Sequence, residues 1–395
     1  MKKSRIPNLR TMVEAVAVAS VSLGAGTMAS ASAVEHHPAA QQVEQRFEVS
    51  GAVVESDQIL DLEGVKDVID GKIQPEMSLS ELQGVAADAT AWLRTQGYAV
   101  AQVTLPAQTL RDGTVTFKVL PGVLDTVEMK NHSRVSNQKL QRLVDAQVRP
   151  DEAITQADLE RAFLLASDLS GTGRVNGALS SGTRQGTSRL SLEIPRQNSL
   201  TGGIGVDNYG NRYTGESRVS GDISWNNPTG SGDAINAAVV VTEEEMYYGQ
   251  IGYEMRPGSS GVMLGASLVN NQYELGEEFS ALDATGESTT ATVFAKYPLV
   301  RGIYSNVFLS GSVGHRRLED SVGFSDSTVK KTANVASLGF AANRRDRWLG
   351  GGQFDLNMSY TAGDLKFDTP FAEAIDELGP ETAGSYGKWQ ADPAH

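Results

Sequence analysis

The alternation of apolar and polar positions in residues 45–195 describes the same arrangement of elements twice. In the first copy, Ser78 and Glu81 have the spacing of a helix-capping box, and Gly97 supplies the stop signal of that helix. The apolar residues behind the cap recur at helical spacing: Leu79, Leu82, Ala86, Ala89 and Leu93. The predicted order is strand, helix, helix, strand, strand, over residues 47–54, 56–71, 79–96, 98–105 and 114–120.

A second copy follows about 75–80 residues later and predicts the same order. Thr155 and Asp158 take the places of the capping pair, and Gly171 ends the helix that they begin. Gly186 precedes the last strand, as Gly113 does in the first copy. The predicted elements cover residues 124–131, 136–147, 156–170, 174–180 and 187–194. Such a repeat indicates two tandem modules, not one large core.

From residue 203 the hydrophobic period changes to two, which is the period of a strand with two different faces. About nine such strands follow, each near the ten residues that cross a bilayer at a tilt. Tight turns and longer polar loops alternate between them: turns at 227–230 and 257–260, loops at 274–286 and 318–328. Short turns at one end and long loops at the other are typical of an outer-membrane barrel, although a soluble β-sandwich or solenoid fits the same alternation.

The alternation also assigns the two faces of each predicted strand. Ile251, Tyr253 and Met255 are expected to face lipid, and Gln250 and Glu254 to face the lumen of a barrel. A charge on the lipid face costs roughly 2–4 kcal/mol near the bilayer midplane, so polar side chains belong on the lumen side.

The first 33 residues have the layout of a secretory signal peptide. Four cations precede an apolar run over residues 15–28, and Ala31-Ser32-Ala33 offers a small-residue cleavage site. The run is too short and too rich in Ala, Gly and Ser for a transmembrane anchor. Export to the cell envelope is therefore predicted.

The amino-acid composition argues against several kinds of partner and site. The net charge of −14 argues against a nucleic-acid partner, and the absence of cysteine excludes disulfides and thiolate sites. No catalytic or nucleotide-binding motif is visible; Gly171-Thr172-Gly173 is interpreted as a helix end, and Glu243-Glu244-Glu245 as a solvated turn in preference to a calcium site. The chain is thus predicted to be no enzyme and to need no cofactor, metal or small-molecule substrate.

Several motifs give the chain a family resemblance. The first copy resembles the first POTRA module of the hemolysin activation/secretion family, the TpsB outer-membrane transporters of two-partner secretion, in Gly97-Tyr98, Leu105-Pro106-Ala107-Gln108, Asp112-Gly113 and Leu120-Pro121-Gly122. The resemblance continues beyond the modules in Asp207-Asn208-Tyr209-Gly210, Thr214-Gly215, Asn226-Asn227-Pro228, Gly232-Asp233 and Tyr297-Pro298-Leu299. It covers about residues 45–390, nearly the whole chain after the signal peptide.

The resemblance implies an α+β pair of tandem POTRA modules (β-α-α-β-β) followed by an antiparallel transmembrane β-barrel, which is incomplete in this chain. The expected parts are the signal peptide 1–33, an N-terminal segment 34–45, modules over 46–122 and 123–196, and a partial barrel over 200–395. The modules would lie in the periplasm and the barrel in the lipid of the outer membrane. The implied partner is a large secreted exoprotein of hemolysin or adhesin type, bound through its N-terminal secretion domain.

Partner binding is expected at an edge of the first module, because an edge strand offers unpaired backbone groups to an incoming strand. The predicted strand 98–105 and the helix before it supply the candidate residues: Trp92, Tyr98, Val100, Gln102 and Thr104. Packing of the module alone is an equally good interpretation of Trp92.

Two alternative functions and two departures from the family pattern remain open. The chain could be a POTRA-bearing factor that assembles or inserts other outer-membrane proteins, or a truncated transporter that retains only partner binding. Truncation is expected because the family continues with more strands after residues 388–389, and Pro393 suits a central strand poorly. Val300-Arg301-Gly302 resembles a family motif from late in the barrel, but its early position favours a coincidental turn.

Overall fold

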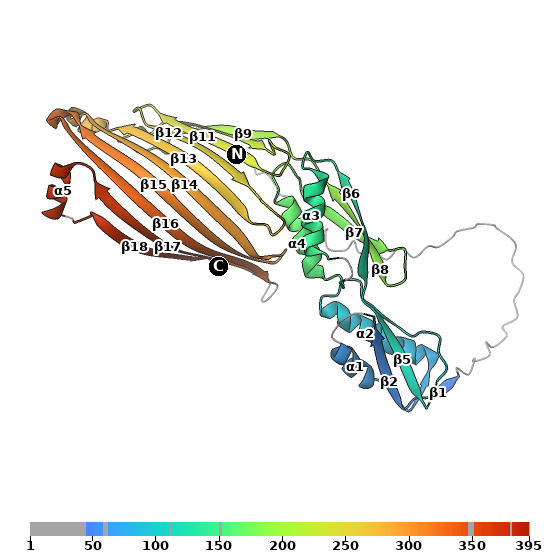
Figure 1. The fold of residues 1–395 in the computed structure, drawn as a ribbon. Coiled ribbons are helices and arrows are strands. Elements are labelled where there is room, and N and C mark those ends of the chain that lie inside the picture. Colours follow the sequence, from blue (N-terminus) through green and yellow to red (C-terminus); the bar gives the residue numbers. More distant parts are fainter. Residues whose placement is uncertain are drawn as a thin grey trace, which may run out of the picture. The chain divides into compact units, whose positions relative to one another are not determined.

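The computed structural model describes residues 45–57, 62–110, 112–149, 152–346, 351–379 and 381–394. The predicted signal peptide and all but the last residue of the predicted segment 34–45 lie outside these residues. In the described part, no helix is both long and apolar enough to cross a membrane. The elements form two small α/β modules and one long antiparallel sheet (Figure 1).

The first module has the predicted strand–helix–helix–strand–strand order, with one added strand pair. Its elements are β1 (Arg46–Glu48), β2 (Gly51–Ser56), α1 (Leu62–Asp70), β3 (Glu76–Ser78), α2 (Leu79–Thr95), β4 (Gln102–Thr104) and β5 (Thr114–Leu120). The sheet order is β2-β5-β4, and β1 pairs separately with β3. The predicted capping box is present, since the Glu81 N–H donates to Ser78 Oγ and the Ser78 N–H donates to the Glu81 carboxylate. Phe117, Ile69 and Leu93 are fully buried in the core of this module.

The second module repeats that order without the added pair. It consists of β6 (Val123–Asn131), α3 (Asn137–Gln147), α4 (Gln156–Ser167), β7 (Asn176–Ser181) and β8 (Thr187–Ile194). Its sheet order is β6-β8-β7, the counterpart of β2-β5-β4. Thr155 caps α4 by accepting a hydrogen bond from the Asp158 N–H, as the sequence predicts. Leu140, Ile154 and Leu190 lie fully buried in the core.

The long sheet contains ten strands in sequence order, where the sequence predicted about nine. They are β9 (Leu200–Asp207), β10 (Arg218–Asn226), β11 (Ala234–Thr242), β12 (Tyr247–Met255), β13 (Met263–Glu274), β14 (Ala284–Arg301), β15 (Ser305–Val322), β16 (Ser327–Asp346), β17 (Gly352–Phe367) and β18 (Gly384–Ala394). Each strand pairs antiparallel with its neighbours, and β9 and β18 form the two ends of the described sheet. Two 3-10 turns, η1 (Glu277–Leu282) and η2 (Gly323–Ser325), and one helix, α5 (Pro370–Glu377), lie in its connections.

Two element predictions need correction here. The helix predicted over 56–71 is shorter, Leu62–Asp70. The polar loop predicted at 318–328 is mostly strand, because β15 continues to Val322 and pairs with β16 across Glu319↔Lys330 and Asp320↔Val329. Cross-strand ion pairs between Glu319 and Lys330 and between Asp320 and Lys331 stabilise that polar end, so polarity there does not indicate a loop.

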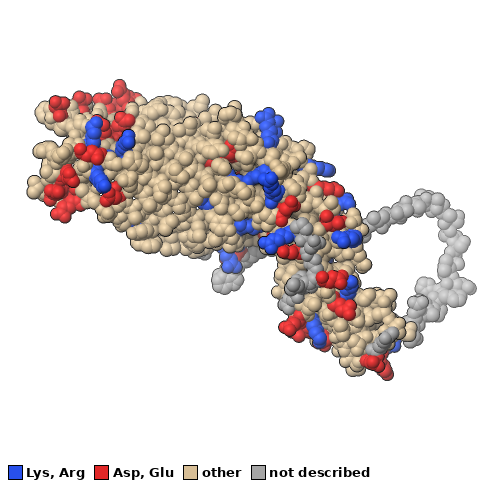
Figure 2. All heavy atoms as spheres, viewed as in Figure 1, with Lys and Arg blue, Asp and Glu red and all other residues tan. Residues whose placement is uncertain are grey.

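The two faces of the sheet differ as the alternation predicts. Ile251, Tyr253 and Met255 are exposed by 53%, 38% and 36%, while Gln250 and Glu254 lie on the opposite face and are less exposed. Directly paired residues of antiparallel strands share a face, so Leu268 lies beside Ile251 on the apolar side. On the side seen in Figure 2, charged side chains gather at the left end of the sheet, and a broad uncharged area follows.

Glycines of the sheet lie under aromatic rings of neighbouring strands. A Cβ atom at Gly265 would lie 2.3 Å from Phe294 Cζ, and one at Gly363 would lie 2.3 Å from Tyr386 Cζ. Each glycine is the direct cross-strand partner of its aromatic residue. The ring fills the space beside a strand glycine that has no side chain of its own. This packing explains part of the high glycine content.

Candidate partner-binding site

β4 forms an edge of the first module's sheet, as the sequence predicts for this region. The edge is short, however, and its middle is occupied. The Val103 N–H points away from β5 and donates to Thr90 Oγ1 at 2.8 Å, and that hydroxyl donates to the Ala86 carbonyl at 2.8 Å. Thr90 belongs to α2 and is 8% exposed. An incoming strand would therefore have to displace this hydroxyl from β4.

The predicted strand 98–105 is wrong in its first half. Residues 97–99 bond instead to the start of α4 in the second module: the Ala99 N–H donates to the Ile154 carbonyl, and the Gln156 N–H donates to the Gly97 carbonyl. These bonds join the two modules. The alternating pattern gave no sign of them, because the partner segment lies more than fifty residues further along the chain.

The five predicted partner-binding residues consequently lie in three environments. Gln102 and Thr104 are on β4, and Gln102 is exposed. Trp92 is half-buried against the core of the first module. Tyr98 pairs with Thr155 across the module junction, and Val100 packs against the core of the second module. The structure thus places only Gln102 and Thr104 on the edge strand itself.

The second module contacts three hairpin turns, β10–β11, β12–β13 and β14–β15, which lie at the same end of the long sheet. Lys139, on α3, donates from Nζ to the carbonyls of Arg256 and Gly258 in the β12–β13 turn. Burial, followed by the charge of Arg142, lowers the pKa of Lys139. In the β10–β11 turn, the Gly230 carbonyl accepts from the Ser136 N–H at 3.0 Å. The module is therefore held by backbone groups of the turns.

α4 supplies further contacts at these turns. Arg161 donates from Nη2 to the carbonyls of Ser260 and Pro298, at 3.3 and 3.1 Å. Leu165 lies so close to Gly261 that a Cβ there would be 2.5 Å from Leu165 Cδ2. Gly261 also has φ +85°, a conformation that favours glycine. A side chain at this turn would separate α4 from the sheet.

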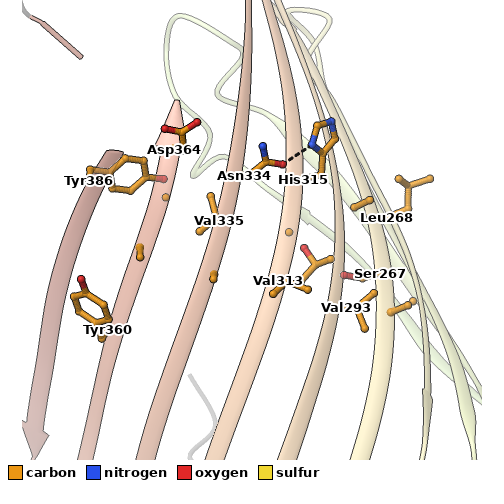
Figure 3. Close-up of a pocket in the computed structure, with 18 of the residues that line it drawn as sticks. Ser267, Leu268, Val293, Val313, His315, Asn334, Val335, Tyr360, Asp364 and Tyr386 are labelled. Carbon is orange, nitrogen blue, oxygen red and sulfur yellow. Dashed lines mark hydrogen bonds between the residues drawn. The ribbon is translucent and has the colours of Figure 1, made fainter. Parts of the chain in front are cut away.

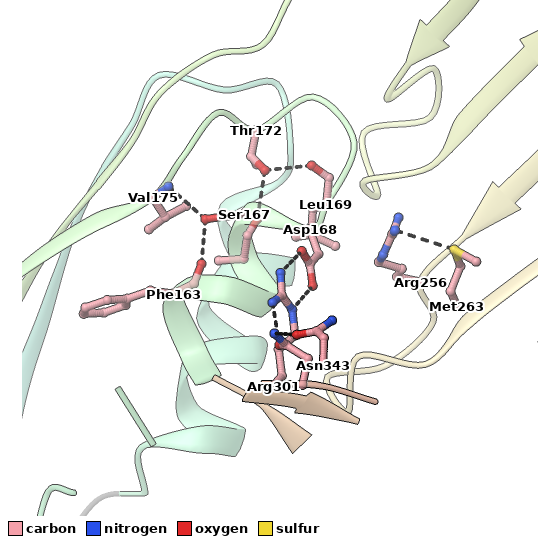
Figure 4. Close-up of polar contacts among 12 residues, drawn as sticks. Phe163, Ser167, Asp168, Leu169, Thr172, Val175, Arg256, Met263, Arg301 and Asn343 are labelled. Carbon is pink, nitrogen blue, oxygen red and sulfur yellow. Dashed lines mark hydrogen bonds and ion pairs between the residues drawn. The ribbon is translucent and has the colours of Figure 1, made fainter. Parts of the chain in front are cut away.

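An ion pair crosses the same junction (Figure 4). Arg301, the last residue of β14, donates from Nε and Nη2 to both carboxylate oxygens of Asp168, which follows α4. Arg301 Nη1 also donates to Asn306 Oδ1 at 2.8 Å, and Asn306 donates to Asn343 on β16. The interpretation of residues 300–302 as a coincidental turn missed this role, since no local pattern connects Arg301 with Asp168.

A hollow of about 1330 Å³ lies over the middle of the long sheet (Figure 3). Most residues lining it belong to the apolar face, including Ile251, Leu268, Val293 and Val313. His315 and Asn334 form a hydrogen bond of 2.9 Å beside it. Among the residues that the structure describes, no group of three or more His, Asp or Glu side chains is placed to hold a metal ion.

Comparison with known proteins gives matches in both halves of the chain. Residues 47–122 match the POTRA domain, ShlB-type, and residues 186–393 match the haemolysin secretion/activation protein ShlB/FhaC/HecB. The chain is 28% identical over 274 residues to the heme/hemopexin transporter protein HuxB of Haemophilus influenzae (strain 86-028NP), a match that covers 69% of this chain and 48% of HuxB. It is 25% identical over 299 residues to the outer membrane transporter CdiB of an Escherichia coli strain, covering 73% and 49%. The chain thus spans about half the length of these relatives.

Solved structures support the fold. CdiB from Escherichia coli superposes with a TM-score of 0.71 at 20% identity, over 91% of this chain and 67% of CdiB. CdiB from Acinetobacter baumannii gives a TM-score of 0.58 at 17% identity, over 91% and 65%. At this level of identity the likeness shows architecture alone: POTRA modules followed by the antiparallel sheet of a barrel.

Proposed function

The chain belongs to the haemolysin secretion/activation family ShlB/FhaC/HecB, and from that membership we propose that it works as an outer-membrane transporter of two-partner secretion. The two modules lie in the periplasm and bind the N-terminal secretion domain of a large exoprotein. The sheet is part of the barrel through which the exoprotein leaves the cell. Its task is transport and not catalysis.

The docking of the second module on the sheet is the observation that carries this proposal. A transporter must transfer the bound exoprotein from its recognition modules to its pore. Here α3 and α4 contact the turns β10–β11, β12–β13 and β14–β15. The second module therefore lies at the end of the strands where these turns are. The bonds between residues 97–99 and 154–156 connect the first module to this assembly.

Within the first module, we place partner contact on the outer side of β4 and the adjoining surface of α2. Gln102, Thr104 and Trp92 are the residues available there, whereas Tyr98 and Val100 support the contact by holding the modules together. The Val103 N–H faces outward, so the Gln102 N–H faces β5 in an antiparallel pair. Proline at Gln102 would break the module's own ladder and is a poor test.

Side-chain replacement is the sharper experiment. In cells that produce the full chain and its exoprotein partner, Gln102→Arg combined with Thr104→Arg is expected to reduce secretion several-fold while the chain stays at its normal level. Gln83→Arg, on an exposed position of α2, is the matched control and should secrete normally. Normal secretion by the double variant would remove β4 from the site. Insertion of other barrel proteins without any exoprotein secretion would replace transport by assembly as the function.

A further inference from the structure

The helix α5, in the connection between β17 and β18, is turned the opposite way from an ordinary surface helix. Such a helix buries its apolar side and exposes its polar side. In α5 the charged residue Asp376 is only 4% exposed, whereas Phe371 and Ile375 are 74% and 52% exposed. Leu378, directly after the helix, is 90% exposed. Spacings of four and three residues place Phe371, Ile375 and Leu378 on one side, and together they form the α5 surface.

Asp376 holds α5 in this orientation. Its carboxylate accepts hydrogen bonds from Thr382 Oγ1 at 2.6 Å and from the Ala383 N–H at 2.8 Å, just before β18 begins. These hydrogen bonds, together with the charge of Lys331 on β16, lower the pKa of Asp376, so the group is ionised at neutral pH. If the helix rolled over, the carboxylate would lose these partners, and a buried charge without partners is costly. The apolar side of α5 therefore stays turned outward.

The position of α5 follows from the order of the strands. The turns that contact the second module join even-numbered strands to the next odd-numbered ones, so the β17–β18 connection lies at the other end of the antiparallel sheet. Figure 1 shows α5 at the end of β17. Lys331, whose charge acts on Asp376, lies on the same face of the sheet as Gln250. Direct cross-strand pairs lead from Gln250 to the neighbourhood of Lys331 through Val269, Thr290, Arg316 and Ala333. α5 is therefore packed beside the face that is expected to line the lumen.

Charged residues separate the α5 surface from the apolar face of the sheet. On the apolar side of β17, Ala362 is followed by Asp364 and Lys366, and Asp368 then precedes α5. Direct cross-strand pairs place Asp364 on the same face as Ile251, through Leu268, Ala291, His315 and Asn334. About 20 Å of extended chain lies between Ala362 and Asp368. Since charged side chains do not lie in hydrocarbon, the α5 surface lies beyond the lipid and meets water.

The surroundings of the α5 surface are acidic. Residues 368–387 contain no Lys or Arg and carry five carboxylates, Asp368, Glu373, Asp376, Glu377 and Glu381. Glu373 and Glu377 are exposed on α5 itself. An apolar surface surrounded by negative charge favours a ligand that has both apolar and cationic side chains. A second copy of this chain, with a net charge of −14, is a poor match for it.

We propose that the α5 surface binds the exoprotein as it leaves the pore, through an extended segment that carries apolar and basic side chains. This rests on the proposed function and adds a contact at the outer end of the sheet. The exoprotein passes this end unfolded, with its apolar side chains still uncovered. Phe371, Ile375 and Leu378 contact those side chains, and Glu373 and Glu377 attract the cations beside them. A segment held at α5 is hindered from returning into the pore, so the contact favours outward movement.

The binding test uses the full chain in phosphatidylcholine nanodiscs, because this lipid has no net charge that would attract a cationic peptide. Ala374→Cys, at an exposed position beside the α5 surface, carries an environment-sensitive dye, and the chain has no native cysteine to interfere. The probe is a nonapeptide of three Lys-Val-Ser repeats, which should shift the dye emission to shorter wavelength in a saturable way. Peptides with Glu in place of Lys, or with Ser in place of Val, should bind about tenfold more weakly or less.

Substitutions in the labelled chain separate the apolar from the charged contribution. Ile375→Ser should weaken the probe about tenfold, because an aliphatic side chain is no longer removed from water on binding. Ile375→Leu keeps the apolar side chain and should bind like the original chain. Glu373→Gln combined with Glu377→Gln should weaken binding about threefold at low salt and hardly at about 1 M salt. Phe324→Ser is the matched control, since Phe324 is 81% exposed on η2 at the same end of the sheet, and it should leave binding unchanged.

Three results of the binding test overturn the proposal. They are the absence of a saturable shift with millimolar probe, an unchanged affinity in Ile375→Ser, and a dye emission that is already shifted before peptide is added. An early shift that depends on the lipid identifies lipid as the cover of the α5 surface. An early shift that grows with protein concentration identifies a second copy of the chain.

Secretion distinguishes this proposal from the proposed function on which it rests. In cells that produce the full chain and its exoprotein partner, Ile375→Ser combined with Leu378→Ser should reduce secretion several-fold while the chain stays at its normal level. Normal secretion by this variant removes α5 from the transport path and leaves the transporter. If the original chain itself secretes nothing, the proposed function fails, and the exoprotein fails with it as the ligand of α5.

Discussion

Asp168 and Arg301 connect the second module to the long sheet through two parallel hydrogen bonds, 2.9 Å from Nε to Oδ2 and 2.7 Å from Nη2 to Oδ1. Their side chains are 29% and 19% exposed, so water screens the pair only in part. Planar two-point contacts of this kind fix orientation as well as distance. The pair therefore sets the angle at which α4 meets the end of β14.

Arg301→Gln should loosen this junction. It removes both charged hydrogen bonds, and a bond to a charged group contributes about 1.5–3 kcal/mol. Hydrogen exchange should report an opening free energy for α4 that is lower by about that amount. Arg212→Gln removes an exposed ion pair with Glu278 and should change stability by less than about 1 kcal/mol. Equal effects of the two substitutions would show that the junction does not depend on Arg301.

Features that depend on neighbouring residues could be predicted from the sequence, whereas contacts between distant segments could not. The capping box of Ser78 and Glu81 spans four residues, and the start of β8 at Thr187 follows a glycine, so both were predictable from neighbouring residues. The bond between Ala99 and Ile154 and the pair Asp168–Arg301 join segments 55 and 133 residues apart. Nothing near either residue in the sequence indicates its partner.

The candidate site shows the same difference: its position at a sheet edge was predictable, but the contact that occupies the edge was not. The sequence correctly predicted an edge near residues 102–104, because a strand order of β-α-α-β-β places the fourth element at the side of the sheet. It could not show that Thr90 occupies that edge, since a threonine within a helix usually contacts only its own helix.

The capping box predicts a pH dependence for the start of α2. Hydrogen bonding by the Ser78 N–H, followed by the charge of Arg46, lowers the pKa of Glu81. A carboxyl group whose pKa is lower in the folded state stabilises the fold above its unfolded value of about 4.3, and this is lost as pH falls through the folded pKa. The protection of amides in the first turn of α2, taken relative to the intrinsic exchange rate at each pH, should therefore fall below about pH 4. Glu81→Gln should remove that pH step, and a step of equal size in the variant would contradict this assignment.

Two glycines should respond to alanine in opposite directions. Gly84 lies on the exposed side of α2 with nothing within 4 Å of a Cβ, so Gly84→Ala should stabilise the helix by about 0.5–1 kcal/mol. Gly261→Ala places a methyl group against Leu165 at φ +85° and should destabilise the junction by more than about 1 kcal/mol. Opening free energies from hydrogen exchange in α2 and α4 measure both. Stabilisation by Gly261→Ala would mean that the turn moves freely away from α4.

Thr90→Val tests the hydrogen bond by which Thr90 occupies the β4 edge. Valine keeps the shape but leaves the Val103 N–H without its acceptor, which costs about 1–3 kcal/mol in a buried site. Exchange of the Val103 amide should accelerate. Thr90→Ser keeps the hydroxyl and is the control. If Val103 exchanges at the original rate in Thr90→Val, the hydroxyl does not close the edge.

The two faces of β12 give the most direct test of a membrane location for the sheet. Ile251 is exposed by 53% on the apolar face, and its neighbour Gln250 lies on the other face near Tyr248, to which it is hydrogen-bonded at 2.6 Å. If the apolar face meets lipid, Ile251→Arg should lower the stability of the inserted sheet by about 2–4 kcal/mol, because a cation near the bilayer midplane is poorly solvated. Gln250→Arg should have little effect, since its side would face water.

Cysteine labelling supplies an independent readout on the same strand, and the chain has no native cysteine to interfere. With a water-soluble reagent, Glu254→Cys should label faster than Ile251→Cys when the protein is in membranes, and the difference should vanish in denaturant. Faster labelling at Ile251 would reverse the assignment of the faces. Equal labelling in membranes, together with equal effects of the two arginine substitutions, would mean that both faces of this sheet meet water and that it does not line a pore through lipid.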